Sequence, residues 1–167
     1  MSAMKPNTNE LLTKVAYGDR EEIVSTFDGM DCSFTDAKGQ NVLFPAIAKK
    51  RGLTAFFLDR GAGMDQQNID GNTPLHLAAA NMDIDSARVL LERGADVTLE
   101  NKYGNQVLWA ALMEAIKVVN LPQGYELLEM LLAHGADRDH RNHAGMTPRF
   151  FVESNVSDTR IRGMFLT

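Results

Sequence analysis

The sequence has little of what several large classes of protein require. Cys32 is the one cysteine in 167 residues, so no internal disulfide can form, and we expect it to behave as a small buried hydrophobe. The first ten residues hold no apolar segment of the kind a secretory signal needs, which favours a reducing, cytoplasmic location. No apolar run approaches the roughly 18 residues of a membrane span, so a membrane protein is not expected.

Positive charge is also scarce. The chain carries 22 acidic and 17 basic residues, a net charge of −5. Proteins that bind nucleic acid neutralise phosphates with lysine and arginine, so we do not expect a nucleic-acid partner. The glycines of Gly61-Ala62-Gly63 are not followed by the further glycine and lysine of a phosphate loop, so no nucleotide or other cofactor is expected.

What the sequence does contain is an internal repeat with a period of about 33 residues. Its clearest copy spans residues 68–100 and consists of a polar turn, two short helices and a closing Gly-Ala-Asp. Gly71 permits the positive φ of a tight turn, Pro74 suits the first position of a helix, and Gly94 ends the second helix. Apolar residues at helical spacing give the two helices faces that pack together: Leu75, Leu77, Ala78 and Ala79 in the first, and Ala87, Val89, Leu90 and Leu91 in the second.

The run Thr73-Pro74-Leu75-His76-Leu77-Ala78-Ala79, followed by Gly94-Ala95-Asp96, resembles the ankyrin repeat. The same frame divides the chain into an N-terminal cap, three units and a C-terminal cap, at about 4–35, 36–67, 68–100, 101–141 and 142–167. The fourth unit holds eight more residues than the third, placed between its helices. The resemblance implies one all-α solenoid domain over residues 1–167, with short β-hairpin turns and atypical capping units.

Three histidines are the main candidates for chemistry. His76 and Thr73 could form a catalytic pair, but the resemblance implies local hydrogen bonds that lock the turn against the helix. His140 and His143 lie close to acidic residues in the sequence, which could suggest a metal site. No cysteine pair or helical pair of histidines supports such a site, so we expect a polar turn here. We therefore predict no metal site, no catalytic residue and no enzymatic activity.

Aromatic residues replace His76 at the equivalent position of the other units, namely Phe44, Trp109 and Phe150. These residues form either a partly exposed row suited to partner binding or packing between units, and the sequence leaves both open.

The loop between the helices of the second unit carries Lys49-Lys50-Arg51, which is either a solvated loop or a site for an acidic partner. The matching loop of the third unit has Asp83 and Asp85. Charge of alternating sign would orient one particular partner.

The excess in the fourth unit spans residues 113–124 and begins as a helix. We predict that the inner helix continues to Val119 and stops at Asn120 and Pro122. Its apolar residues need cover, either from the neighbouring unit, which we expect, or from a partner: Ile116, Val118, Val119 and Leu121.

The resemblance implies recognition of a protein through the turn tips and inner helices. Ile69 and Tyr103 stand out there as apolar bodies that no packing requires. The predicted contact residues are Lys38, Gln40, Lys49, Ile69, Asp70, Asn72, Asn81, Lys102, Tyr103, Asn105, Trp109, Met113 and Glu114.

Two kinds of small ankyrin protein are similar to this chain. One is the immunity protein that bacteria keep beside a secreted toxin, and the acidic charge would suit a basic toxin or effector. The other is the cyclin-dependent-kinase inhibitor of the ankyrin type. We favour a cytoplasmic inhibitor of the first kind, monomeric when free.

Overall fold

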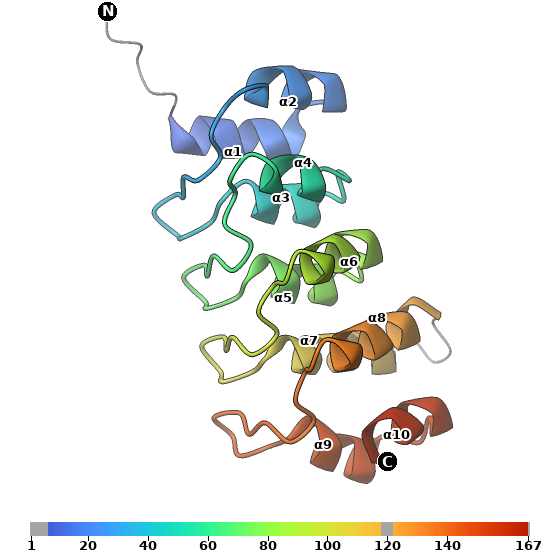
Figure 1. The fold of residues 1–167 in the computed structure, drawn as a ribbon. Helices are drawn as coiled ribbons and strands as arrows, with labels where there is room; N and C mark the ends of the chain where they lie inside the picture. The colour runs from blue at the N-terminus through green and yellow to red at the C-terminus, as the bar shows by residue number, and fades with distance from the viewer. Residues whose placement is uncertain (1–6, 118–121, 167) are drawn as a thin grey trace, which may run out of the picture.

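The computed structural model describes residues 7–117 and 122–166. These residues form ten helices and no strand, so the predicted all-α class is confirmed. Figure 1 shows the helices stacked in pairs, in chain order, with loops projecting to one side. The helices of the inner layer are α1 (Thr8–Tyr17), α3 (Leu43–Ala48), α5 (Pro74–Ala80), α7 (Val107–Lys117) and α9 (Pro148–Asn155). Those of the outer layer are α2 (Arg20–Phe27), α4 (Thr54–Leu58), α6 (Ile84–Glu92), α8 (Pro122–Ala133) and α10 (Thr159–Leu166).

Polar side chains fix where several helices begin. Thr73 accepts a hydrogen bond from the backbone N–H of His76, and the His76 ring in turn meets the backbone N–H of Thr73, which completes a capping box. Pro74 and Pro148 occupy the start of their helices, where a missing N–H costs nothing. The Thr-Pro pairs of the sequence therefore set the start of α5 and α9.

The core runs without interruption between the two layers, from Leu11 in α1 to Phe165 in α10. Phe27 and Phe57 are fully buried and meet edge to face, with 5.2 Å between ring centroids. Each fully buried aliphatic or aromatic side chain contributes about 1.5–3 kcal/mol. Since no single helix pair buries its own apolar face, each unit depends on its neighbours.

The extra residues of the fourth unit lengthen both of its helices. Helix α7 has 11 residues where α5 has 7, and α8 has 12 where α6 has 9. The predicted end of the inner helix at Val119 lies outside the described residues, as do Val118, Asn120 and Leu121. Pro122, expected only as a stop, also begins α8.

The described part of this excess packs in part against the core. Ile116 is half-buried, packs against the core and lines a small hollow beside Val156 and Ile161 of the last unit. Tyr125 is buried, and its hydroxyl donates a hydrogen bond of 2.6 Å to Asp158. The core therefore covers Ile116 in part, and cover of the rest by the next unit stays a prediction.

The turns between units are tight loops, and the described residues contain no β-ladder there. Each loop closes with two backbone hydrogen bonds. In the loop that begins at Asn68, the N–H of Asn68 donates to the carbonyl of Asn72 at 3.0 Å and the N–H of Gly71 donates to the carbonyl of Asn68 at 2.8 Å. The predicted hairpins are therefore too short to form strands.

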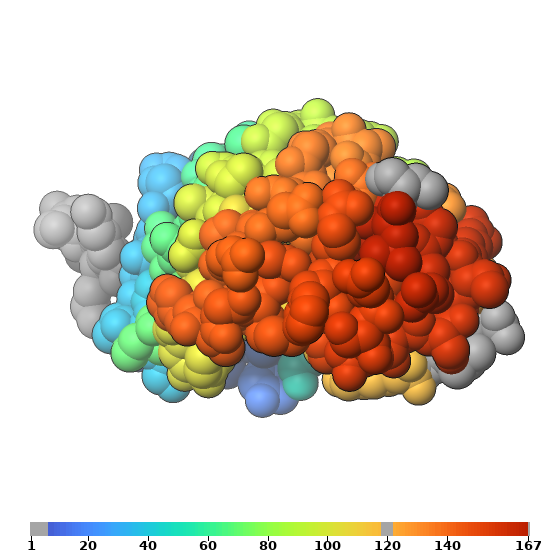
Figure 2. All heavy atoms as spheres, turned by 90° about the horizontal axis from the view of Figure 1, so that it is seen from below, coloured from blue at the N-terminus to red at the C-terminus, as the bar shows by residue number. Residues whose placement is uncertain are grey.

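The last helix pair closes the lower end of the stack, with the earlier units behind it (Figure 2). The position of a unit in the stack explains how exposed its aromatic residue equivalent to His76 is. Phe44 is 3% exposed because the third unit covers it, whereas Phe150 is 53% exposed because no described unit follows it. Trp109 is half-buried and meets Phe151 edge to face at 5.6 Å. The aromatic row is thus mainly packing between units.

Candidate partner-binding surface

Four loops, at residues 36–40, 68–72, 101–105 and 142–146, form the tips that project from the stack, and we call them fingertips. Each begins with Asp or Asn, whose side-chain oxygen accepts from the backbone N–H groups two and four residues later. In the second fingertip, both bonds to Asn68 measure 3.0 Å. Such turns hold the backbone without help from a strand.

Glycine is required where neighbouring loops lie so close. Gly71 has a φ of 76°, and a Cβ placed on it would lie 2.8 Å from the Cα of Asn101 in the next fingertip. Successive fingertips are joined by backbone hydrogen bonds of 2.7–3.0 Å, from Ile69 to Lys38, from Lys102 to Asp70 and from His143 to Tyr103. The fingertips therefore form one continuous edge.

Side-chain amides tie this edge together further. The Nδ2 of Asn101 donates to the Oδ1 of Asn72 at 3.0 Å, and Asn142 donates to Asn105 at 2.8 Å. Asn72 and Asn105 are half-buried and have this bond within the stack. Their role in partner contact stays a prediction.

Large apolar side chains are left in solvent on this side of the molecule. Ile69 is 76% exposed and Tyr103 is 59% exposed, both at fingertips. Tyr17, at the end of α1, is 76% exposed and is absent from the predicted contact residues. Helical spacing is the signal that could have found it, because Leu11, Leu12 and Val15 form the buried stripe of α1 and Tyr17 lies off it.

The charged residues predicted at the surface differ in whether they already have partners. The Nζ of Lys102 lies 2.7 Å from Asp70 and 5.1 Å from the Tyr103 ring centroid, and the bond to Asp70 raises the pKa of this lysine. Lys117 lies 2.5 Å from Glu114. No such ion pair is present for Lys38 or Lys49 within the described chain.

The other predicted contact residues are less exposed. Gln40, Asn81 and Met113 are half-buried, and Met113 packs against the core. Their part in binding, like that of Trp109, stays a prediction.

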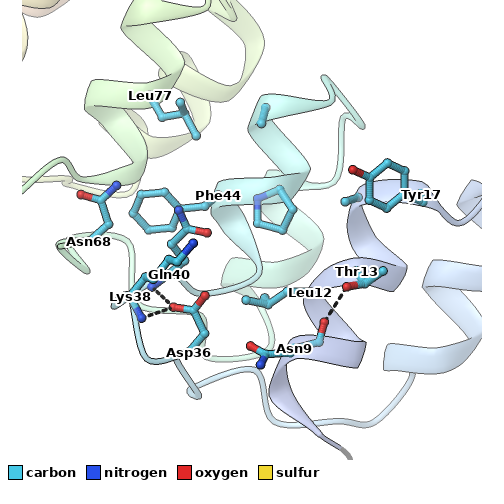
Figure 3. Close-up of a pocket in the computed structure, with 13 residues that line it drawn as sticks. Asn9, Leu12, Thr13, Tyr17, Asp36, Lys38, Gln40, Phe44, Asn68 and Leu77 are labelled. Carbon is cyan, nitrogen blue, oxygen red and sulfur yellow. Dashed lines mark hydrogen bonds between the residues drawn. The ribbon is translucent and has the colours of Figure 1, made fainter. Parts of the chain in front are cut away.

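Fingertips and inner helices share an open hollow of about 710 Å³ at the N-terminal end (Figure 3). Helix α1 supplies Leu12 and Tyr17, the first fingertip supplies Lys38 and Gln40, and α3 supplies Phe44. The fingertips and the inner helices line this hollow together. We therefore refer to both as the inner face.

The outer helices show a different pattern of charge. Ion pairs join each outer helix, or the residues just past its end, to the next: Asp28 with Arg60 at 3.4 Å, Asp59 with Arg93 at 2.8 Å, Arg88 with Glu126, and Glu129 with Arg160 at 2.8 Å. Exposed pairs contribute little stability individually. Each of these eight charged side chains on the outer helices therefore already has an oppositely charged neighbour.

Comparison with known sequences decides the family. Residues 11–101 and 48–142 each match a family model described as ankyrin repeats in three copies. The chain belongs to the ankyrin-repeat family. Ankyrin repeats are protein–protein interaction modules and are generally non-catalytic, so the chain carries a protein-binding surface.

Relatives of this ankyrin chain include much longer proteins. It is 30% identical over 154 residues to the BRCA1-associated RING domain protein 1 of Caenorhabditis elegans, covering 92% of this chain and 21% of that protein. It is 31% identical over 128 residues to the E3 ubiquitin-protein ligase KEG of Arabidopsis thaliana, covering 75% and 8%. A putative ankyrin repeat protein of Rickettsia felis is 29% identical over 136 residues, covering 78% and 42%. The chain thus spans less than half the length of each.

His76 makes the local hydrogen bonds implied by the ankyrin resemblance. Its Nδ1 lies 2.9 Å from the hydroxyl of Thr73, and its Nε2 lies 3.1 Å from the carbonyl of Asn105 in the next fingertip. A carbonyl only accepts, so Nε2 carries the proton and Nδ1 accepts from Thr73. Burial lowers the pKa of His76, which keeps the ring neutral. Both ring nitrogens of His76 are therefore engaged in hydrogen bonds, one of which joins this unit to the next.

The remaining candidates for chemistry are also tied to the fold. His140 donates to the carbonyl of Gly104 at 3.0 Å, and no group of three metal-binding side chains occurs among the described residues. Cys32 is buried, and burial raises the pKa of its thiol to about 11, so the thiol is protonated at neutral pH. Within the same described ranges, no helix is long and apolar enough to cross a membrane.

The basic loop of the second unit divides into two parts. Arg51 is half-buried and donates a hydrogen bond of 2.6 Å to the carbonyl of Ala16, near the end of α1, so this arginine holds the first two units together. Lys49 and Lys50 are exposed. Of the three basic residues, only the two lysines are therefore open to a partner.

Proposed function

We propose that this ankyrin chain is a non-catalytic inhibitor that sequesters a protein partner on its inner face. One observation carries the proposal. Ion pairs join several of the charges on the outer helices to one another, whereas the inner side leaves Tyr17, Ile69 and Tyr103 in solvent. Exposed aromatic residues on a rigid support are favoured as binding hot spots.

The finer proposal is a cytoplasmic immunity protein that neutralises a cognate secreted toxin. The net charge of −5 supports a partner that is basic overall, because opposite charges accelerate association. The fixed fingertips support tight capture, because a preformed surface loses little entropy on binding. As an inhibitor, the protein would act as a monomer.

Capture from a native lysate, followed by mass spectrometry, tests this proposal. Wild-type protein is compared with Ile69→Ser/Tyr103→Ala and with Glu92→Ala, an exposed residue of outer helix α6 with no ion pair among the described residues. We expect one protein to be captured by the wild type and by Glu92→Ala and lost with the double variant.

The identity of that protein decides between the two forms of the proposal. A secreted toxin whose activity falls on addition of the chain supports the immunity role. A cyclin-dependent kinase would replace it with the signalling role, and capture that survives the double variant but fails with Glu92→Ala would place the binding surface on the outer helices.

A further inference from the structure

The N-terminal hollow of the inner face combines positive charge that has no carboxylate partner with an apolar floor. Leu12 and Phe44 are buried beneath it, and Ala48 and Tyr17 are exposed at its side. Figure 3 shows Lys38 and Gln40 of the first fingertip on one side and Tyr17 on the other. The hollow therefore offers apolar contact below and polar contact at its rim.

Positive charge is concentrated at this rim. Lys38 lines the hollow, and the Nζ of Lys49 lies 5.1 Å from the centroid of the Tyr17 ring. Among the described lysines, Lys14, Lys102 and Lys117 are each paired with a carboxylate. Lys38, Lys49 and Lys50 are not, and of these three Lys38 lines the hollow and Lys49 lies against the Tyr17 ring at its side. In a chain of net charge −5, two such unpaired cations beside one hollow are a local exception.

One acidic residue lines the same hollow, and its carboxylate is used elsewhere. Asp36 also lines the hollow, and its Oδ1 accepts from the backbone N–H groups of Lys38 and Gln40 at 2.8 Å each. That carboxylate is committed to holding the fingertip. The negative charge of Asp36 reduces the positive potential in the hollow, but Asp36 forms no ion pair with Lys38 or Lys49.

We propose that the hollow binds an acidic segment of the partner protein, with carboxylates on Lys38 and Lys49 and an apolar side chain over Leu12 and Phe44. This inference rests on the proposed function, of which it specifies the partner chemistry. It is compatible with a partner that is basic overall, because the hollow covers only one end of the inner face. The residues at the start of this chain carry Lys5 and no acidic residue over 1–6, so they are a poor electrostatic match.

A peptide selection on the intact protein tests the assignment even while the partner is unidentified. A displayed library of random short peptides is selected, and bound sequences are titrated against wild type, Lys38→Glu/Lys49→Glu and Lys50→Glu/Lys117→Glu. The two double variants change the net charge equally, but Lys50 and Lys117 neither line this hollow, as Lys38 does, nor lie against its Tyr17 ring, as Lys49 does. Thermal unfolding checks that each variant is folded.

We expect the selected peptides to be rich in Asp and Glu beside an aliphatic or aromatic residue. Reversal at Lys38 and Lys49 should raise the dissociation constant about tenfold or more, and the control should change it much less. The affinity should also fall with added salt, because exposed charges are screened.

Three outcomes would overturn the inference: selection of peptides with no acidic bias, no selection of any peptide, or equal effects of the two double variants. A single-stranded oligonucleotide that bound as tightly through the same lysines would replace the acidic protein segment with a polyanion. Each of these results leaves the proposed inhibitor intact if lysate capture still depends on Ile69 and Tyr103, so the two proposals fail separately.

Discussion

The Nδ2 group of Asn101 donates a 3.0 Å hydrogen bond to the Oδ1 of Asn72, and so side chains as well as backbone bonds fasten one fingertip to the next. Asn101 also uses its Oδ1 to accept from the backbone N–H groups of Tyr103 and Asn105. One residue thus shapes its own fingertip and positions the neighbouring one. Hydrogen bonds of these two kinds, within a fingertip and between neighbouring fingertips, make the inner face rigid.

These two duties of Asn101 can be separated by substitution. Asn101→Asp keeps the acceptor of the turn, as Asp36 does in the first fingertip, but loses the donor, so we expect a cost of about 1 kcal/mol. Asn72→Ala should cost about the same, and Asn101→Ala about 2–3 kcal/mol, because three bonds are lost. Denaturant unfolding measures each value.

A double-mutant cycle provides the control for the amide bond. Asn72→Ala combined with Asn101→Asp should cost no more than either change alone, because both remove the same bond. Additive costs would show that the bond contributes nothing measurable.

Two glycines with similar backbone conformations allow the cost of a steric contact to be measured apart from the cost of backbone strain. Gly71 and Gly94 have φ values of 76° and 87°, yet a Cβ on Gly71 would meet Asn101 and one on Gly94 would meet nothing within 4 Å. Gly94→Ala should therefore cost about 1–2 kcal/mol from backbone strain alone. Gly71→Ala should cost clearly more, because the fingertips must also move apart.

Chemical denaturation of the two glycine variants checks this difference. Equal losses of stability would mean that the contact between fingertips is soft and that the inner face is not held rigid by it.

His76 makes stability depend on pH in a defined window. Burial lowers its pKa in the folded state, so the unfolded chain binds a proton more readily. The free energy of unfolding should therefore fall as the pH drops below about 6.5, the ordinary value for an unfolded histidine, until the lowered folded value is reached. Above pH 7 this contribution is constant.

Urea unfolding of wild type and His76→Gln between pH 5 and 8 isolates the effect. The variant should lose stability overall because its bonds to Thr73 and Asn105 are changed, but its slope in this window should flatten. An unchanged slope would assign the dependence to other groups.

The sequence predicts the fold well because the repeat signals act locally. The positive φ of Gly71, the helix start at Pro74 and the bonds of His76 depend on residues within one unit or the next, and all are present in the structure. The helix excess in the fourth unit could also be anticipated from continued helical periodicity.

The surface is harder to predict because exposure depends on which unit covers a residue. Phe44 and Phe150 occupy equivalent positions, yet one is buried and the other exposed, since only the first is followed by another described unit. Arg51 looks like part of a basic run, but its side chain reaches a carbonyl of the first unit. Tyr17 lies in a cap that lacks the repeat motif. Spatial neighbours, rather than residue type, decide these cases.

The inner face is proposed to bind a protein, and a binding titration of Tyr103→Ala against the captured partner tests this most directly. Tyr103 is 59% exposed, and its ring lies beside the ammonium of Lys102 at the molecular surface. We predict an unchanged melting temperature and a dissociation constant raised roughly 30-fold, which corresponds to a loss of about 2 kcal/mol at a hot spot. Unchanged affinity in a fully folded Tyr103→Ala variant, with affinity lost instead in Glu92→Ala, would contradict it.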